Sequence, residues 1–422
     1  MIYKKTTLKN GLRVITIPEE DSLAVAVFVL VEAGSKYEKK EINGLSHFLE
    51  HMCFKGTKTR PTALDISSEL DSLGAQFNAF TSQEFTGYYA KVAANHFDKA
   101  LDIVSDLYLN PVIDSVELEK EKGVIVEEIN MYEDLPQHRV QDLILEALYG
   151  DQPAGWNIAG DKETVRKFDR ETFLKYRGEH YVSSATTVVV AGNFNEEKAI
   201  KDIEEKFKGM HSGEKHGKLA VIEAQKAPLV LTKKKESDQT HLVLAVRTFS
   251  ATDKRNHTID VLSQVLGGGM SSRLFQKVRE EMGAAYYVRC SNNTHTDHGF
   301  LEASAGADNK RAKEVISAIV AEFARMKNEL PTEKELNRAK ESLIGNMFLS
   351  LETSDAIAGH YGLQEVIKRE IEEPEEYAKK IRAVTGEEVM TVAKEIFRQE
   401  HLNLALIGPA ENKDDFVSLL KL

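Results

Sequence analysis

The stretch NGLSHFLEHMCF, residues 43–54, is the one around which the rest of the sequence is organised. If it is helical, His47 and His51 stand four residues apart, one above the other on the same face. Two imidazoles at that spacing can bind one metal ion. Glu50, three residues after His47, points to nearly the same side and can hold a water molecule against the metal. The stretch therefore predicts a short helix that carries a metal site.

His-x-x-Glu-His is the inverted form of the His-Glu-x-x-His zinc helix and is typical of inverzincin peptidases. The alternative is a helix that carries two histidines by chance, because short motifs recur. Zinc in a catalytic site takes three protein ligands and leaves the fourth position to water. Two histidines therefore require a third ligand from another part of the chain.

The acidic segment 117–128 offers candidates for this third ligand. In a helix, Glu128 shares its face with Glu121, Val124, Ile125 and Tyr132. Two carboxylates would thus stand on a largely apolar face. Glu127 shares its face with a more solvated set of residues. A buried ligand is expected on the apolar face, which favours Glu128. The alternative is the solvated acidic face of an ordinary Glu- and Lys-rich helix.

Four residues of the chain resemble the zinc site of the family of pitrilysin, insulin-degrading enzyme and the mitochondrial processing peptidase: His47, Glu50, His51 and Glu128. Glu128 stands 77 positions after His51, as the third ligand of that family does after its second histidine. A further glutamate one heptad before the ligand assists catalysis in the family, and Glu121 stands there. The resemblance implies one zinc ion per chain, bound by His47, His51 and Glu128.

The chemistry expected of such a site is hydrolysis of a peptide bond. Zinc lowers the pKa of its bound water and polarises the scissile carbonyl. Glu50 is expected to take the water proton as a general base and to pass it to the leaving amine. We therefore expect a zinc-dependent endopeptidase that acts on peptides or unfolded segments.

Segments outside the metal site extend the resemblance over nearly all of the chain. Residues 78–84 resemble the strand on which the family lays the substrate backbone. Substrate contacts are therefore expected from Asn78, Ala79, Phe80 and Thr81. Arg279 and Tyr286 stand seven residues apart, like the Arg/Tyr pair of the family's C-terminal domain, and imply contacts to substrate and oxyanion. Without the resemblance, Arg279 would be interpreted as an exposed helix residue and Tyr286 as a strand core residue.

Metal ligands and the Arg/Tyr pair occur here in one polypeptide, at roughly half the length of the single-chain members of the family. This arrangement resembles the short bacterial type, in which two identical two-domain subunits enclose a chamber. It implies a homodimer that admits peptides or unfolded polypeptide. Two alternatives stay open: the two domains of one chain close on each other, or the Arg/Tyr pair reaches the zinc of the partner.

The order of elements in the first half of the chain is repeated in the second half. In each half, strands with alternating patterns come first, helices follow, and a strand closes the half. Residues 209–227 lack periodicity and are the expected linker. The predicted fold class is α+β, with two structurally related domains, 1–208 and 228–422. Each is expected to pack a mainly antiparallel sheet against helices and to form half of a closed peptide chamber.

Composition narrows the class of protein. The chain has 422 residues with 42% hydrophobic and 29% charged side chains, typical of a globular protein. Its net charge of -12 argues against nucleic acid as a partner. The longest apolar run, residues 23–31, is too short to span a bilayer, and we see no signal peptide. With only Cys53 and Cys290, a reducing, cytoplasmic setting is expected, without a membrane partner.

Two rival functions belong to other classes. One is a non-catalytic structural or assembly subunit of the same fold, like the core proteins of the respiratory bc complex, which have usually lost the metal ligands. The other is a module that grips peptides without cutting them. Trp156 and Asn157 depart from the family's Gly-Arg-x-Ile-x-Gly-like segment, which leaves substrate preference near that loop open. Cys53 is expected to be buried in packing and not to bind metal.

Overall fold

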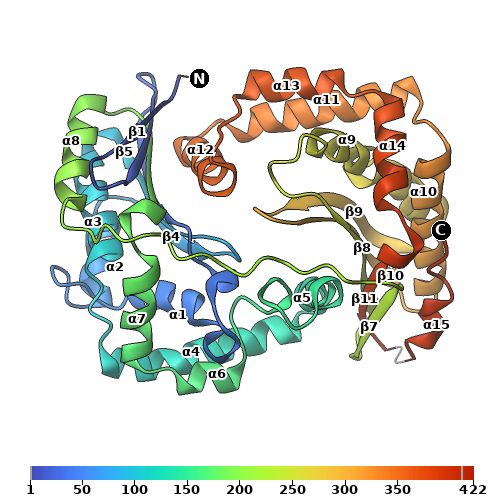
Figure 1. Ribbon diagram of the computed structural model, residues 1–422, viewed down its shortest axis with the longest axis horizontal. Coiled ribbons are helices and arrows are strands. Elements are labelled where there is room, and N and C mark those ends of the chain that lie inside the picture. Colours follow the sequence, from blue (N-terminus) through green and yellow to red (C-terminus); the bar gives the residue numbers. More distant parts are fainter. Residues whose placement is uncertain (1, 410–411) are drawn as a thin grey trace. The chain divides into compact units, whose positions relative to one another are not determined.

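The computed structural model describes residues 2–409 and 412–422. The chain forms two compact units, each built from segments that are distant in sequence (Figure 1). Unit 1 comprises 1–129, 157–219 and 349–371. Unit 2 comprises 130–156, 220–348 and 372–422. Each unit has its own sheet and its own hydrophobic core.

The sheet of unit 1 has six strands in the order β1-β2-β6-β3-β5-β4. Their bounds are β1 (Lys4–Thr7), β2 (Arg13–Pro18), β3 (Ala24–Val31), β4 (Gln76–Thr81), β5 (Thr86–Ala93) and β6 (Thr186–Gly192). Only β2 and β6 run parallel, while the other neighbours are antiparallel. The helices of this unit, with all but the last turn of α4, are α1 (Leu45–Cys53), α2 (Ala63–Ser72), α3 (Phe97–Leu109), α4 (Ser115–Asp134), α6 (Lys162–Lys167), α7 (Arg170–His180), α8 (Glu196–Phe207) and α12 (Ser354–Lys368).

The central strand β3 is buried on both faces, and its continuous apolar run is typical of such a strand. Because side chains alternate along a strand, its odd-numbered valines, 25 to 31, join the core that α1 and α3 cover. Its even-numbered side chains face α12. There Gly362 comes so close that a Cβ added to it would lie 2.6 Å from Leu30 Cδ1. A side chain at position 362 would therefore require the side chains of Leu30 and Val189 to shift.

The sheet of unit 2 has five strands in the order β7-β11-β8-β10-β9. Their bounds are β7 (Leu229–Lys234), β8 (Gln239–Thr248), β9 (Ala285–Thr294), β10 (Gly299–Asp308) and β11 (Asn403–Gly408). Again one pair, β7 and β11, is parallel and the others are antiparallel. This order matches β2-β6-β3-β5-β4 of unit 1 strand for strand. The predicted fold class, two related α+β domains with mainly antiparallel sheets, is confirmed.

Helices cover both faces of the second sheet as well. They are α5 (Pro136–Tyr149), α9 (Asn256–Gly267), α10 (Ala312–Asn328), α11 (Glu333–Ser350), α13 (Pro374–Ala383), α14 (Gly386–Ile396) and α15 (Asp414–Val417). On one face, α5 packs against Val243, Ala245 and Ala405. On the other, α9, α10 and α14 pack against Leu242 and Leu244. The segment Phe275–Glu281 of this unit is a π-helix.

The units differ from the predicted ranges 1–208 and 228–422 in two exchanged helices. Helix α5 comes from the first half of the sequence but packs on β11 and β8 of unit 2. Helix α12 comes from the second half but packs on β3 and β6 of unit 1. Both are amphipathic in sequence, and periodicity alone does not say which sheet an apolar face will cover. The expected linker, 209–227, has neither helix nor strand.

Two further predictions concern the cysteines and membrane-spanning segments. Cys53 and Cys290 are buried and do not form a disulfide, in agreement with the predicted packing role of Cys53. Among the described residues, every helix is too short or too polar to cross a lipid bilayer.

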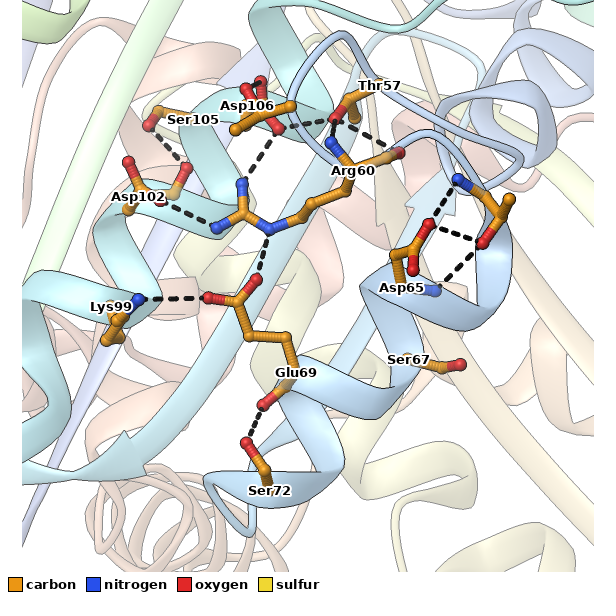
Figure 2. A network of polar contacts seen from close by, with 12 residues as sticks. Thr57, Arg60, Asp65, Ser67, Glu69, Ser72, Lys99, Asp102, Ser105 and Asp106 are labelled. Atoms are coloured by element: carbon orange, nitrogen blue, oxygen red, sulfur yellow. Dashed lines mark hydrogen bonds and ion pairs between the residues drawn. The ribbon is translucent and has the colours of Figure 1, made fainter.

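A buried charge network fixes the loop that follows the metal helix candidate (Figure 2). Arg60, 6% exposed, donates to carboxylates on two helices. Its Nε lies 2.6 Å from Glu69 of α2, Nη2 2.7 Å from Asp102 and Nη1 2.9 Å from Asp106 of α3. Thr57 donates to Asp106 over 2.5 Å. The network therefore ties the loop after α1 to α2 and α3.

Replacing Arg60 with alanine is expected to lower the free energy of unfolding by about 3 kcal/mol, because the buried carboxylate of Asp106 loses its counter-charge. Lys99→Ala is the matched control, since Lys99 is exposed and reaches Glu69 over 3.3 Å. Its expected effect is below about 0.5 kcal/mol. Urea unfolding followed by circular dichroism measures both. Equal midpoints for the two variants would contradict this role of Arg60.

Candidate metal centre

Helix α1 separates an apolar face from a polar one. Its apolar side chains Leu45, Phe48, Leu49, Met52 and Cys53 are all fully buried in the core of unit 1. His47, Glu50 and His51 occupy the remaining face and are only partly buried. The predicted helix over 43–54 is thus confirmed, and its amphipathic pattern is what turns the three polar residues away from the core.

The two histidines meet a carboxylate from α4. The rings of His47 and His51 have centroids 4.8 Å apart. Glu128 Oε2 lies 3.6 Å from Nε2 of His47 and 3.5 Å from Nε2 of His51. One ligand atom from each residue lies within 4.8 Å of the others. Glu127, the alternative on the same helix, is exposed.

Glu121 lies behind His51, one heptad before Glu128 on α4. Its Oε1 is 2.9 Å from His51 Nδ1, and its Oε2 is 2.6 Å from Lys55 Nζ. An imidazole that donates from Nδ1 to a carboxylate keeps the lone pair of Nε2 free for a metal. In this structure Glu121 therefore contacts the candidate ligand His51 and is placed to orient its ring.

The surroundings shift the pKa values of the two histidines in opposite directions. Burial and the neighbouring His51 lower the pKa of His47 to about 4, so His47 is neutral at neutral pH. Burial acts to lower the pKa of His51, but the hydrogen bond to Glu121 and the charges of Glu128 and Glu50 raise it above its ordinary value. Burial would raise the pKa of Glu121, but hydrogen bonds from His51 and Lys55 lower it. A carboxylate therefore stays ionised behind the second histidine.

Glu50 stands on the same face but bonds to a different element. Thr81, the last residue of β4, donates its hydroxyl to Glu50 Oε2 over 2.6 Å. Burial raises the pKa of Glu50, an effect that Thr81 and His51 oppose and Glu128 reinforces. The strand end thus holds this carboxylate beside the ligand cluster.

The other predicted site residues lie on two edge strands or next to one. Asn78, Ala79, Phe80 and Thr81 belong to β4, the last strand of the unit 1 sheet. Arg279 and Tyr286 belong to unit 2, on the π-helix and on β9. The guanidinium carbon of Arg279 lies 5.7 Å from the ring centre of Tyr286. Tyr286 is 72% exposed, which contradicts its interpretation as a strand core residue.

Two contacts of the site go beyond the sequence prediction. Thr81 is predicted to touch substrate, and in the structure its hydroxyl also bonds to Glu50. Lys55, which pairs with Glu121, is not among the predicted site residues. Both contacts join segments that lie together only in the folded chain. Spacing along helix α1 therefore does not predict the hydrogen bond from Thr81 to Glu50. Lys55 stands four residues after His51, and that spacing offered a clue.

The chemistry of the donor set fits zinc. Two imidazole nitrogens and one carboxylate oxygen make a ligand set known from catalytic zinc sites, which keep one position open. Tetrahedral ligands at the usual zinc distances are about 3.4 Å apart, and the two nitrogen–oxygen separations here are 3.6 and 3.5 Å. These three residues are the one such group of His, Cys, Asp or Glu side chains found among the described residues.

The fold and the candidate metal ligands together define a class of protein. It has two related α+β units, one of which carries the His-x-x-Glu-His motif on a helix. The family model of the insulinase peptidases, peptidase family M16, matches residues 13–162. The model described as the peptidase M16 inactive domain matches residues 167–343. This chain belongs to peptidase family M16, and all four residues of the site lie within the first match.

Relatives extend over the full length of the chain. The uncharacterized zinc protease YmxG of Bacillus subtilis is 38% identical over 412 residues, which cover 97% of this chain and 99% of that protein. An uncharacterized zinc protease of Rickettsia felis is 34% identical over 413 residues, covering 96% and 98%. The family assignment therefore holds for both units.

Solved structures show the same fold. A protease from Helicobacter pylori superimposes with a TM-score of 0.91 at 22% identity, covering 97% of this chain and 99% of that one. A peptidase M16 inactive domain from Pseudomonas fluorescens gives a TM-score of 0.89 at 17% identity, covering 98% and 100%. At such identities the likeness concerns the fold alone.

Replacing Glu121 with glutamine is expected to weaken zinc binding by about 10- to 100-fold, because His51 loses an ionised acceptor behind Nδ1. Glu119→Gln is the control, since Glu119 lies on the same helix, is exposed and pairs only with Lys122 among the described residues. Competition with a chromophoric chelator gives both dissociation constants. Unchanged affinity in Glu121→Gln would show that the hydrogen bond does not support the ligand.

Proposed function

We propose that this chain is a zinc-dependent endopeptidase that hydrolyses peptides and unfolded segments. The observation that carries the proposal is the convergence of His47, His51 and Glu128. The carboxylate of Glu50 is close enough to interact electrostatically with His51 and Glu128 and is not one of the three. When bound by these three ligands, zinc supplies polarisation of a carbonyl oxygen and acidification of water. The remaining work falls to side chains of the protein.

Glu50 is suited to move the proton. Its Oε2 accepts the hydroxyl of Thr81, which fixes the orientation of the carboxylate and leaves Oε1 to accept a proton from the attacking water. The same oxygen can then deliver that proton to the leaving amine, so that Glu50 acts first as general base and then as general acid. Thr81 is a positioning residue for this step.

The substrate is proposed to bind as an extra strand along β4. Within the described residues, β4 pairs with β5 on one side only, so backbone groups on its other side can accept a peptide. Asn78, Ala79, Phe80 and Thr81 would provide these groups next to Glu50. A strand-like backbone is available in peptides and unfolded segments and not in folded proteins, which supports the proposed substrate class.

The partner and the second substrate contact are also part of the proposal. Arg279 and Tyr286 are exposed side by side in unit 2 and are proposed to contact the substrate or its oxyanion. Presence of this pair and of the metal ligands in one short chain supports a homodimer whose subunits enclose a chamber in the cytoplasm. The alternative, a non-catalytic subunit, is disfavoured because such subunits usually lack the ligand set that this chain retains.

The direct test is cleavage of a mixture of unstructured peptides by the zinc-loaded protein, followed by mass spectrometry. We expect internal cleavage, loss of cleavage with a chelator and recovery on addition of zinc. A stably folded protein offered under the same conditions should stay intact. Absence of cleavage by protein that contains one zinc per chain would contradict the proposed function and favour the non-catalytic alternative.

A further inference from the structure

A buried glutamate, Glu38, accepts hydrogen bonds at the N-terminal end of helix α1. Glu38 lies between two short 3-10 turns, Ser35–Tyr37 and Lys40–Ile42, and is 3% exposed. Its Oε1 accepts a hydrogen bond from the backbone N–H of Ser46 over 2.6 Å. Its Oε2 accepts from the backbone N–H of Gly44 over 2.8 Å and from Asn43 Nδ2 over 3.1 Å. Both oxygens of a buried carboxylate are thus directed at the first residues of α1.

These contacts replace the usual helix cap. The first N–H groups of a helix have no partner within the helix, and a side chain at the N-cap normally accepts one of them. In α1 the N-cap is Gly44, which has no side chain to do so. The carboxylate of Glu38 takes over this role and also places a negative charge at the positive end of the helix dipole.

A second set of contacts clamps the same helix end. Gly44 has φ +99 and lies so close to the backbone of Ala159 that an added Cβ would be 2.5 Å from the carbonyl oxygen. Gly160 approaches Asn43 from the other side in the same way. Ser46 Oγ lies 2.7 Å from the hydroxyl of Tyr176. The start of α1 therefore has a defined position, from which the histidines follow.

The position of α1 relative to α4 matters for metal binding, because the three candidate ligands come from these two helices. His47 directly follows Ser46, the residue whose N–H Glu38 accepts, and His51 stands one turn further along. Glu128 comes from α4. A helix of nine residues has little stability of its own, so its rotation and axial position depend on outside contacts.

We propose that Glu38 is a positioning residue for the metal helix, whose carboxylate sets the place of His47 and His51 relative to Glu128. The inference rests on the metal site of the proposed function. It adds a residue that lies outside the ligand cluster and acts through the backbone of α1. Its effect should therefore appear in zinc affinity and not only in stability.

The test compares Glu38→Gln with Glu41→Gln. Glu41 lies in the same loop but is exposed, which makes it a matched control. Glutamine keeps the size of Glu38 but turns an NH2 group toward a backbone or side-chain donor. The measurement is zinc affinity by chelator competition at pH 8. Burial raises the pKa of Glu38 to about 7, although hydrogen bonds from Ser46, Gly44 and Asn43 act to lower it. The measurement is therefore made at pH 8, where the carboxylate of Glu38 is ionised.

In Glu38→Gln we expect an affinity loss of about tenfold or more at a temperature where circular dichroism shows the native fold, and no change in Glu41→Gln. If Glu38→Gln does not fold, Glu38→Asp, which keeps the charge but is one methylene too short for all three contacts, should show a smaller loss. Parental affinity in a folded Glu38 variant, even with a lower Tm, would overturn the positioning role alone. A parent protein that binds no zinc would overturn the proposed function and this role together.

Discussion

Replacing Glu50 with glutamine is expected to reduce peptide hydrolysis by at least about 10³-fold while zinc stays bound. Glutamine has nearly the same size, and its carbonyl oxygen can still accept the hydroxyl of Thr81. Its amide cannot accept a proton from water at any accessible pH. The ligands His47, His51 and Glu128 are untouched, so the metal site should remain intact.

The measurement needs two readouts on the same preparation: kcat for a cleaved peptide and zinc content by atomic emission. Loss of turnover with one zinc per chain would support the role of Glu50 as general base. A peptide-binding module would give the opposite result, because its measured function would not depend on Glu50. Turnover above about one tenth of the parental value, with zinc retained, would contradict the assignment.

Replacing Glu128 with glutamine is expected to remove the metal. The variant loses the one anionic ligand of the set, and an amide oxygen is a poor substitute for a carboxylate on zinc. We expect zinc affinity to fall by more than the roughly 100-fold that an outer contact can account for, with hydrolysis lost in parallel. The free energy of unfolding without metal should stay nearly unchanged, since Glu128 is partly exposed.

Glu127→Gln is the control for this variant. Glu127 is the neighbouring glutamate on α4, and it is exposed where Glu128 faces the two histidines. Zinc affinity and turnover should both stay at the parental level. If Glu127→Gln lost zinc and Glu128→Gln retained it, the choice of third ligand would be wrong. Equal loss in both would indicate a general effect of negative charge and not coordination.

Local patterns predicted the parts of this protein that depend on one element. The amphipathic spacing in 43–54 predicts helix α1 and places His47 and His51 on its polar face. The largely apolar face of the helix over 117–128 favours Glu128 over Glu127 as the candidate third ligand, and Glu128 is the one that lies beside the two histidines. Val124 and Tyr132 on that face are nevertheless exposed. The continuous apolar run of residues 23–31 is typical of a strand buried on both faces, and it forms β3. In each case, the periodicity of a single helix or strand decides which side chains are buried.

Contacts between distant segments were not predictable from such patterns. Helices α5 and α12 pack on the sheet of the other half of the sequence, because an apolar face specifies burial and not a partner. The hydrogen bond from Thr81 to Glu50 depends on where β4 ends relative to α1. The cap by Glu38 depends on a loop with no regular periodicity. These features arise from tertiary packing, which the sequence encodes only through the whole fold.

Zinc is proposed to bind between α1 and α4, and anomalous diffraction at the zinc edge from crystals of the zinc-loaded protein would locate the ion. We predict one peak per chain, within about 2.0–2.2 Å of Nε2 of His47, Nε2 of His51 and one carboxylate oxygen of Glu128. Glu50 should approach this peak without binding it. A crystal of zinc-loaded protein with no peak between the histidines, and with Glu128 turned into solvent, would contradict zinc binding by these three residues.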